Sequence, residues 1–368
     1  MNMSMKVKDI TNYLELQAPI SFQESYDNSG LLVGSAKDEV QGILLTLDVT
    51  EEVIEEAIQQ GANLIIAHHP LIFKGLKKIN GNHWVERCVI KAIKNGINIY
   101  AIHTNLDNVS LGVNKRIADQ LQLTNLQILS PKEHTLVKLV TFIPLENKDE
   151  VLKAMYEAGA GQIGNYDHCS YQIEGQGTFR PGEGTHPHTG DVLKDETVNE
   201  VRVEVLISAP QSGKVLKALQ LSHPYEEVAY YLSTLENANQ EVGAGMIGDL
   251  NMPVETEEFL LFLKDRMNTE TIRHTQLCKE KIERVAVCGG AGSFLLAQAK
   301  AQGADIFITG DFKYHEFFEA DSRIIIADIG HYESEQFTKD LLYEILSKKF
   351  TNIALRLSEV VTNPIKYL

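Results

Sequence analysis

The fold of this chain is decided by a stretch that occurs twice, as Gly61-Ala62-Asn63-Leu64-Ile65-Ile66 and as Gly303-Ala304-Asp305-Ile306-Phe307-Ile308. In each copy a glycine ends a predicted helix, and a short apolar run typical of a buried strand follows it. Strands and helices alternate around both copies, which is the βαβ pattern of a mostly parallel sheet. The sequence therefore predicts an α/β fold made of a duplicated unit with mixed sheets, whose two halves are related by a pseudo-twofold axis.

A segment with a different order of elements separates the two halves. We predict its strands at 136–144, 170–179, 201–208 and 228–235, and its helices at 148–158 and 212–221. This order is that of a ferredoxin-like α+β domain. Its loop 180–190 is rich in glycine and proline, which predicts an exposed connection. We therefore expect the first half at 1–130, the insert at 131–242 and the second half at 243–368.

Charge and cysteine content restrict the classes of function. The chain of 368 residues carries a net charge of -16, so phosphate backbones and anionic membranes repel it. We expect neither duplex nucleic acid nor a membrane among its partners. The cysteines have no CxxC spacing and indicate free thiols in a reducing compartment. There is no apolar run of the signal-peptide or membrane-spanning kind, so we expect a cytoplasmic protein.

Histidines and carboxylates follow the predicted strands in both halves. The set consists of His68, His69, His103, Asp107, His331 and Glu335. The pair His68-His69 before Pro70 would by itself indicate two ordinary surface histidines. The other members change that interpretation, because the carboxyl ends of parallel strands meet at one edge of a sheet. Several imidazoles with two carboxylates suit Zn, Mn, Fe or Co better than Mg or Ca. The sequence therefore predicts a site for two metal ions rather than one.

Other motifs give weaker signals. Asp311 and His315 end the strand equivalent to the one before His68, and they are predicted to hold a metal ligand or to transfer a proton. The turn 289–293 opens a predicted helix and is either an anion-binding turn or an ordinary one. The run 26–30 is predicted to be a turn near the cleft. His186 and His188 lie in the glycine-rich loop and favour a solvated loop over a ligand pair.

Taken together, these motifs resemble the GTP cyclohydrolase I type 2 family, which are dinuclear metal proteins related to NGG-interacting factor. The resemblance rests on the runs 27–31, 67–71, 103–107, 309–311 and 330–335. The insert resembles the PII/CutA-like domain of the longer family members. That match rests on Gly177-Thr178-Phe179-Arg180-Pro181 and His223-Pro224-Tyr225-Glu226-Glu227.

The resemblance implies a duplicated α/β unit with a dinuclear metal site in its cleft, assembled as a toroidal homohexamer. It implies two divalent metal ions per subunit, with zinc expected first and Fe, Mn or Co as alternatives. The implied ligands are His68, His69, Asp107, His331 and Glu335, with Glu335 as the bridge. His103 is either a sixth ligand or a residue that holds one.

The implied activity is hydrolytic opening of the imidazole ring of GTP with loss of formate. In that reaction a metal-bound hydroxide is the nucleophile, with Asp311 beside the site and His315 as a proton shuttle. The ligand set suits hydrolysis of a phosphoester or an amide equally well. It also suits a non-enzymatic protein that binds or delivers metal, or one that acts through interactions or regulation. The residues alone leave open whether the chain is an enzyme.

Overall fold

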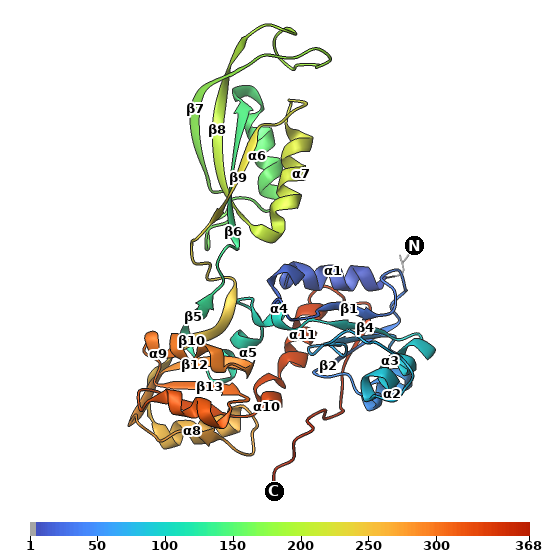
Figure 1. Cartoon of the computed structure of the whole chain (residues 1–368), viewed down its shortest axis with the longest axis vertical. Helices are drawn as coiled ribbons and strands as arrows, with labels where there is room; N and C mark the ends of the chain where they lie inside the picture. Colours follow the sequence, from blue (N-terminus) through green and yellow to red (C-terminus); the bar gives the residue numbers. More distant parts are fainter. Residues whose placement is uncertain (1–4) are drawn as a thin grey trace. The chain divides into compact units, whose positions relative to one another are not determined.

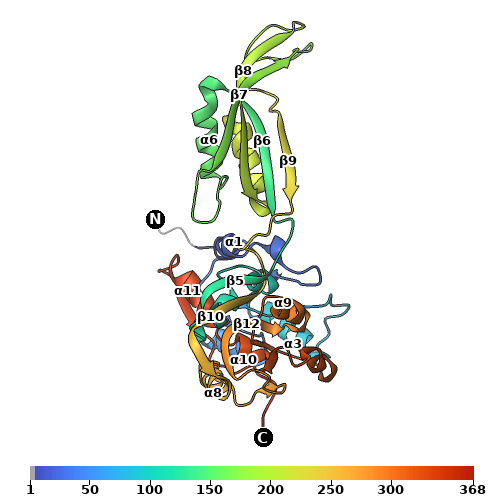
Figure 2. The same cartoon turned by 90° about the vertical axis from the view of Figure 1, so that its left-hand side faces the viewer.

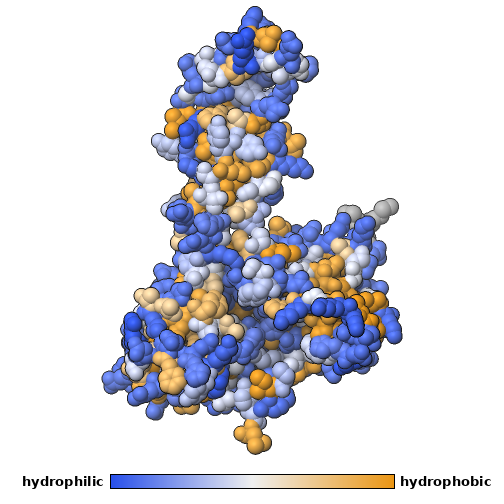
Figure 3. All heavy atoms as spheres, in the orientation of Figure 1, coloured by the Kyte–Doolittle hydropathy of each residue, from blue (hydrophilic) through white to orange (hydrophobic). Residues whose placement is uncertain are grey.

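The computed structural model describes residues 5–368 (Figure 1). The chain divides into two compact units. The outer unit contains the described residues up to Pro131 together with Gln240–Leu368, and the inserted unit contains Lys132–Asn239. Within residues 5–368, no helix is both long and apolar enough to cross a membrane. Hydrophobic side chains are interspersed with hydrophilic ones on the face shown in Figure 3, as on the surface of ordinary globular proteins.

The first sheet of the outer unit has the strand order β1-β4-β3-β2-β15. Its strands are β1 (Gly30–Val33), β2 (Gly42–Thr46), β3 (Leu64–Ala67), β4 (Asn98–Ala101) and β15 (Ala354–Leu357). All pairs are parallel except β1 with β4. Every residue of β2, β3 and β4 is buried, because helices cover both faces of this sheet. That burial is why these strands are continuous apolar runs in the sequence.

Helices on the two faces of this sheet belong to two different hydrophobic clusters. Around it lie α1 (Val7–Gln17), α2 (Glu51–Gln59), α3 (Trp84–Lys94), α4 (Thr104–Asp107), α5 (Val113–Gln120) and α11 (Thr338–Ser347). Leu44 and Ile65 pack with α2 and α3, whereas Ile43 and Ile66 pack with α1 and α5. Alternate residues of a strand point to opposite faces, so each strand contributes to both clusters. Figure 1 shows α1 on one side of the sheet and α2 with α3 on the other.

The second sheet of the outer unit has the order β11-β14-β13-β12-β10-β5. Its strands are β5 (Thr124–Pro131), β10 (Gly243–Glu255), β11 (Arg273–His274), β12 (Lys281–Ala291), β13 (Ile306–Gly310) and β14 (Ile325–Asp328). The strands β12, β13 and β14 are parallel, and the remaining pairs are antiparallel. Its helices are α8 (Thr256–Arg266), α9 (Leu296–Ala301), α10 (His331–Glu335) and the 3-10 helices η4 (Ser293–Leu295) and η5 (Tyr314–Ala320).

The two sheets of the outer unit share a topological pattern. The parallel order β4-β3-β2 in one corresponds to β14-β13-β12 in the other, and an antiparallel strand flanks β4 and β14 alike. Residues of both sheets, among them Ile66 and Ile308, belong to one hydrophobic cluster. The predicted α/β class with mixed sheets is therefore confirmed.

The inserted unit has an antiparallel sheet with the order β7-β8-β6-β9. Along the chain its elements are β6 (Leu136–Pro144), η2 (Leu145–Asn147), α6 (Lys148–Glu157), β7 (Ser170–Phe179), β8 (Glu196–Ser208), η3 (Ala209–Gln211), α7 (Ser212–Ser222) and β9 (Tyr230–Leu235). This is the order of a ferredoxin-like sheet. Val151 of α6 and Leu219 of α7 pack in one core with Leu139 and Val203 of the sheet, so both helices cover the same face (Figures 1 and 2).

Candidate metal centre

The structure brings six of the sequence-predicted residues together, each at or just after the carboxyl end of a parallel strand. His68 and His69 directly follow β3, and Asp107 lies in α4 after β4. His331 and Glu335 are the first and last residues of α10, after β14. Three sets of ligand atoms lie within 4.8 Å of one another: His68, His69 and His103; His69, His331 and Glu335; and His68, Asp107 and Glu335. Both sheets of the outer unit therefore contribute to one cluster.

Local backbone geometry explains how His68 and His69, although adjacent in the chain, both reach the cluster. The His68 amide donates to the Thr46 carbonyl and the His69 amide donates to the Leu47 carbonyl, so the chain still follows β2 here. The centroids of the two imidazole rings lie 5.0 Å apart. Gly330, just before α10, has a φ of 96°, a left-handed conformation that glycine adopts without strain. The short helix that follows sets Glu335 one turn after its first residue.

Glu335 holds the centre of the cluster and is 3% exposed. Its Oε1 lies 3.7 Å from His68 Nε2. Its Oε2 lies 2.9 Å from His69 Nε2 and 3.1 Å from His331 Nε2. Asp107 Oδ1 lies 3.6 Å from His68 Nε2, on the side of Oε1. The two oxygens of one carboxylate thus face two different groups of ligand atoms, which is the arrangement of a bridging carboxylate.

All four histidines have their Nδ1 atom engaged by an oxygen of the protein. These oxygens belong to the Ile102 carbonyl at 2.9 Å from His68, Asp48 at 2.7 Å from His69, Asp27 at 2.7 Å from His103 and Asp311 at 2.8 Å from His331. An Nδ1–H that donates to such an oxygen leaves the Nε2 lone pair for a metal. The cluster therefore presents its nitrogen ligands in fixed orientations.

Two buried polar atoms in the cluster have no hydrogen-bond partner among residues 5–368. They are His68 Nε2 and Asp107 Oδ1. Leaving a buried polar atom unpaired costs about 1–3 kcal/mol, so native proteins rarely do it without a reason. A cation between this nitrogen and this oxygen would satisfy both. The residues present therefore fit a divalent metal ion.

Charge couples the carboxylates and histidines of the cluster. Burial raises the pKa of Asp107 to about 7, and the negative charge of Glu335 adds to the rise. Burial also opposes ionisation of Glu335, but the imidazoles, led by that of His331, hold its pKa well below its ordinary value. Burial disfavours protonation of His69, yet its hydrogen bonds to Asp48 and Glu335 raise its pKa to about 10. A metal ion would have to displace such protons, so it would bind at the expense of the cluster's own ion pairs.

The two residues predicted to act beside the metals are found in different surroundings. Asp311 accepts the hydrogen bond of His331 Nδ1, so it positions a ligand. His315 is exposed on η5, where its ring packs against Tyr314 and Phe318. His315 is not among the residues that line the cleft over the six clustered residues. The structure thus does not bring His315 to the cluster, and its role in proton transfer stays a prediction.

Asp48 contacts the cluster through His69, and sequence reasoning missed it. It lies just past the carboxyl end of β2, next to the strand that leads to His68 and His69. A search for polar residues after the ends of parallel strands would have found it. Asp48 belongs to no recognisable motif, so the motif search did not. Asp27, in the predicted turn 26–30, was named only as part of that turn. His103 and Thr104 donate hydrogen bonds to it and keep its pKa below its ordinary value despite its burial.

The predicted turn 289–293 contains the last three residues of β12, and three of its amides already have acceptors in the protein. The amide of Gly289 donates to Asn114 Oδ1, and the amide of Gly290 donates to Ser334 Oγ. The amide of Gly292 donates to Thr309 Oγ1. These donors are already satisfied by the protein. The turn instead forms one wall of a cleft of about 640 Å³ over the metal ligands, which is large enough for a small organic substrate.

Replacing Asp48 with alanine should weaken metal binding without removing a ligand. His69 would lose the oxygen that fixes its ring, and loss of such a partner typically costs about 10–100-fold in metal affinity. Competition with a chromogenic chelator measures the affinity. Asp38→Ala is the matched control, because Asp38 is exposed and, within residues 5–368, makes hydrogen bonds only through its backbone, to Val7 and Ser35. Equal affinities of the two variants would contradict the role given to Asp48.

Comparison with known proteins agrees with this geometry. The family model of Duf34/NIF3 (NGG1p interacting factor 3) matches residues 5–364. A GTP cyclohydrolase 1 type 2 homolog of Halalkalibacterium halodurans is 39% identical over 364 residues, covering 98% of both chains. One of Bacillus subtilis is 37% identical over 371 residues, covering 99% of both.

Solved structures give the same result. The crystal structure of a Bacillus cereus protein related to NIF3 matches with a TM-score of 0.88 and 38% identity, covering 100% of both chains. A Staphylococcus aureus protein matches with a TM-score of 0.78 and 32% identity over 99% of both. Family model, relatives and structures each span nearly the whole chain. The protein belongs to the Duf34/NIF3 family.

Proposed function

We propose that this protein is a metal-dependent hydrolase that acts on a nucleotide and uses two divalent metal ions. The observation that carries the proposal is the position of Glu335, whose Oε1 faces His68 while Oε2 faces His69 and His331. A carboxylate placed in this way can join two cations. The unpartnered His68 Nε2 and Asp107 Oδ1 support the site next to Oε1.

Two divalent cations bound there would supply an activated water molecule and would stabilise negative charge on the bond that is cleaved. The protein's own residues determine the rest. Glu335 and Asp107 offset the positive charge of the metals. Tyr26, Phe73 and Phe294 line the cleft beside the ligands and offer apolar surface to a flat base. Because the curated relatives are called GTP cyclohydrolase 1 type 2 homologs, GTP is the first nucleotide to test.

Imidazole and carboxylate ligands support zinc as the first metal to consider, with Fe, Mn or Co as alternatives. We further propose that the halves of the outer unit arose by duplication, which their matching strand order supports. The resemblance stated above supports a PII/CutA-like insert, a toroidal hexamer and a place in the cytoplasm.

The test is turnover by the full chain with its metal content measured in the same sample. We expect hydrolysis of GTP with release of formate, or hydrolysis of another nucleotide or phosphoester in a broad panel. We also expect Glu335→Gln to abolish it. If no substrate reacts while metal is fully bound, the enzyme hypothesis fails. The site would then belong to a protein that binds or delivers metal without catalysis.

A further inference from the structure

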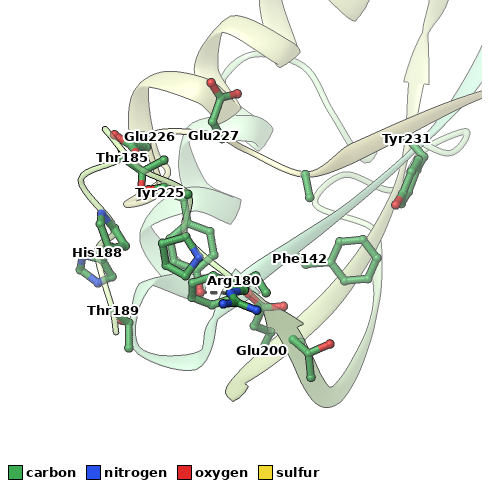
Figure 4. A pocket seen from close by; sticks show the side chains of 17 residues that line it. Phe142, Arg180, Thr185, His188, Thr189, Glu200, Tyr225, Glu226, Glu227 and Tyr231 are labelled. Atoms are coloured by element: carbon green, nitrogen blue, oxygen red, sulfur yellow. Dashed lines mark hydrogen bonds between the residues drawn. The ribbon is translucent and has the colours of Figure 1, made fainter. Parts of the chain in front are cut away.

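The inserted unit contains a cavity of about 450 Å³ that plays no part in the metal centre. Two sequence motifs far apart in the chain line it, the run 177–182 at the end of β7 and the run 225–227 before β9 (Figure 4). Four aromatic rings also line it, those of Phe142, Phe179, Tyr225 and Tyr231. Its volume and its mostly hydrophobic lining are those of a site for a small organic molecule.

Glu200 of β8 is a buried carboxylate in the wall of this cavity, only 9% exposed. Its Oε1 accepts a hydrogen bond of 2.9 Å from the Tyr225 hydroxyl. Burial and the charge of Glu200 raise the pKa of Tyr225 far above its ordinary value, so this hydroxyl remains a donor. Among residues 5–368, no hydrogen bond or ion pair reaches the other oxygen, Oε2. That oxygen can therefore accept a hydrogen bond from a molecule in the cavity.

Gly177 makes room for this carboxylate. A Cβ atom at position 177 would lie 2.2 Å from Glu200 Oε2, far closer than atoms can approach. Gly177 belongs to one of the two motifs, whereas Tyr225, which holds Oε1, belongs to the other. The two motifs thus share one function, which is to hold the Glu200 carboxylate at the wall of the cavity.

Arg180 supplies a positive charge to the same cavity. Within the described part of the chain, its guanidinium has neither an ion pair nor a hydrogen bond. The loop after it is mostly exposed, as predicted, and it also lines the cavity. The His186 amide donates to Glu226 Oε1 at 2.9 Å, and the His188 ring lies 6.1 Å from that of Tyr225. The loop therefore completes a site rather than only joining two strands.

We propose that this cavity binds a small organic molecule that has a phosphate or carboxylate group and a planar ring with an N–H donor. Arg180 would pair with its phosphate or carboxylate group, since guanidinium recognises both. Glu200 Oε2 would accept the N–H, and the aromatic side chains would pack on the ring. An inorganic anion alone would leave this carboxylate and the rings unused. A bare metal cation would meet Arg180 and a largely apolar wall.

Two kinds of metabolite share this chemistry, guanine nucleotides and aromatic amino acids with a ring N–H. GMP and L-tryptophan are suitable probes for titration calorimetry of the full, metal-loaded chain. We expect one of them to bind saturably with a Kd of about 1 mM or tighter. Arg180→Met should weaken this binding by about 10-fold or more, because it removes a charged partner. Arg202→Met is the matched control, since Arg202 pairs with Glu204 on the same sheet and does not line the cavity.

Glu200→Gln and Gly177→Ala test the other half of the site. Both should weaken binding, and their melting temperatures show whether the unit stays folded. Arg180 is exposed, so its variant tests the proposal even if these two unfold. Metal content equal to that of the unmodified protein separates this site from the metal centre.

Binding of GMP alone or of tryptophan alone identifies the source of the ligand. The proposal is overturned if neither probe binds, or if Arg180→Met binds as well as Arg202→Met does. It is also overturned if Arg180→Met lowers the melting temperature while no probe binds to the unmodified chain. In that case Arg180 would serve stability alone.

Discussion

Glu335→Gln is expected to lower the metal affinity of the protein by at least about 100-fold, which corresponds to about 2.7 kcal/mol of binding free energy. The two carboxylate oxygens of Glu335 face His68 on one side and His69 with His331 on the other. In glutamine one oxygen becomes an amide nitrogen, which has no lone pair for a metal. The negative charge is lost as well. A change of one atom would therefore damage both of the proposed metal positions.

Metal analysis of the purified variant after dialysis, followed by calorimetric titration with Zn²⁺, measures this effect. Glu319→Gln is the control, because Glu319 is exposed and its side chain makes no hydrogen bond or ion pair with the rest of residues 5–368. Loss of half of the bound metal would mean that only one position depends on Glu335. Retention of all metal at unchanged affinity would refute its place as a bridge.

Gly310→Ala is expected to displace ligands of the same centre by forcing the backbone next to them to move. A Cβ atom at position 310 would lie 2.8 Å from the His331 amide nitrogen and 2.9 Å from its Cα. Because these are backbone atoms, the start of α10 has to move, and the ligands it carries move with it. Such overpacking costs about 1–3 kcal/mol of stability. We expect a metal affinity lower by about 10–100-fold, the range seen when a ligand loses its orientation.

Thermal unfolding with and without added Zn²⁺ reveals both effects. The stability lost in the metal-free protein reports the backbone clash, and a smaller gain on adding metal reports the displaced ligand. Gly75→Ala is the control, since a Cβ atom at Gly75 meets nothing within 4 Å. A Gly310→Ala protein with the same melting curves as this control would show that α10 tolerates the extra methyl group.

Much of the fold could be predicted from the apolar runs of the sequence, because their length and their flanking residues distinguish strands from helices. The strands around Leu64 and Ile306 are continuous apolar segments because both faces of their sheets are covered. In the inserted unit, β8 begins at Glu196, earlier than the predicted residue 201. Its first five residues are mostly polar, so hydrophobicity gave no signal there. Pairing with β7 through backbone hydrogen bonds extends the strand instead.

The residues of the candidate metal centre could be predicted from the sequence because they lie at the ends of parallel strands. His68 and Glu335 come together because topology places their strand ends at one cleft. The direction of η5 could not be predicted, because a 3-10 helix has no strong sequence pattern, and this one leaves His315 exposed. The contact of Asp48 with His69 depends on side-chain geometry within about 1 Å, which no periodicity encodes.

The inserted unit leaves the outer unit after Pro131, which faces Gly243 across the antiparallel pair of β5 and β10. For the outer unit, the whole insertion is thus a long loop whose two ends are already joined by a strand ladder. The entropy cost of closing a loop rises only logarithmically with its length, by about 0.6 kcal/mol for each doubling. Insertions of different length at this point would therefore cost the outer unit little stability. The β5–β10 pair is thus a position where a new domain can be inserted without disturbing the fold around the cluster.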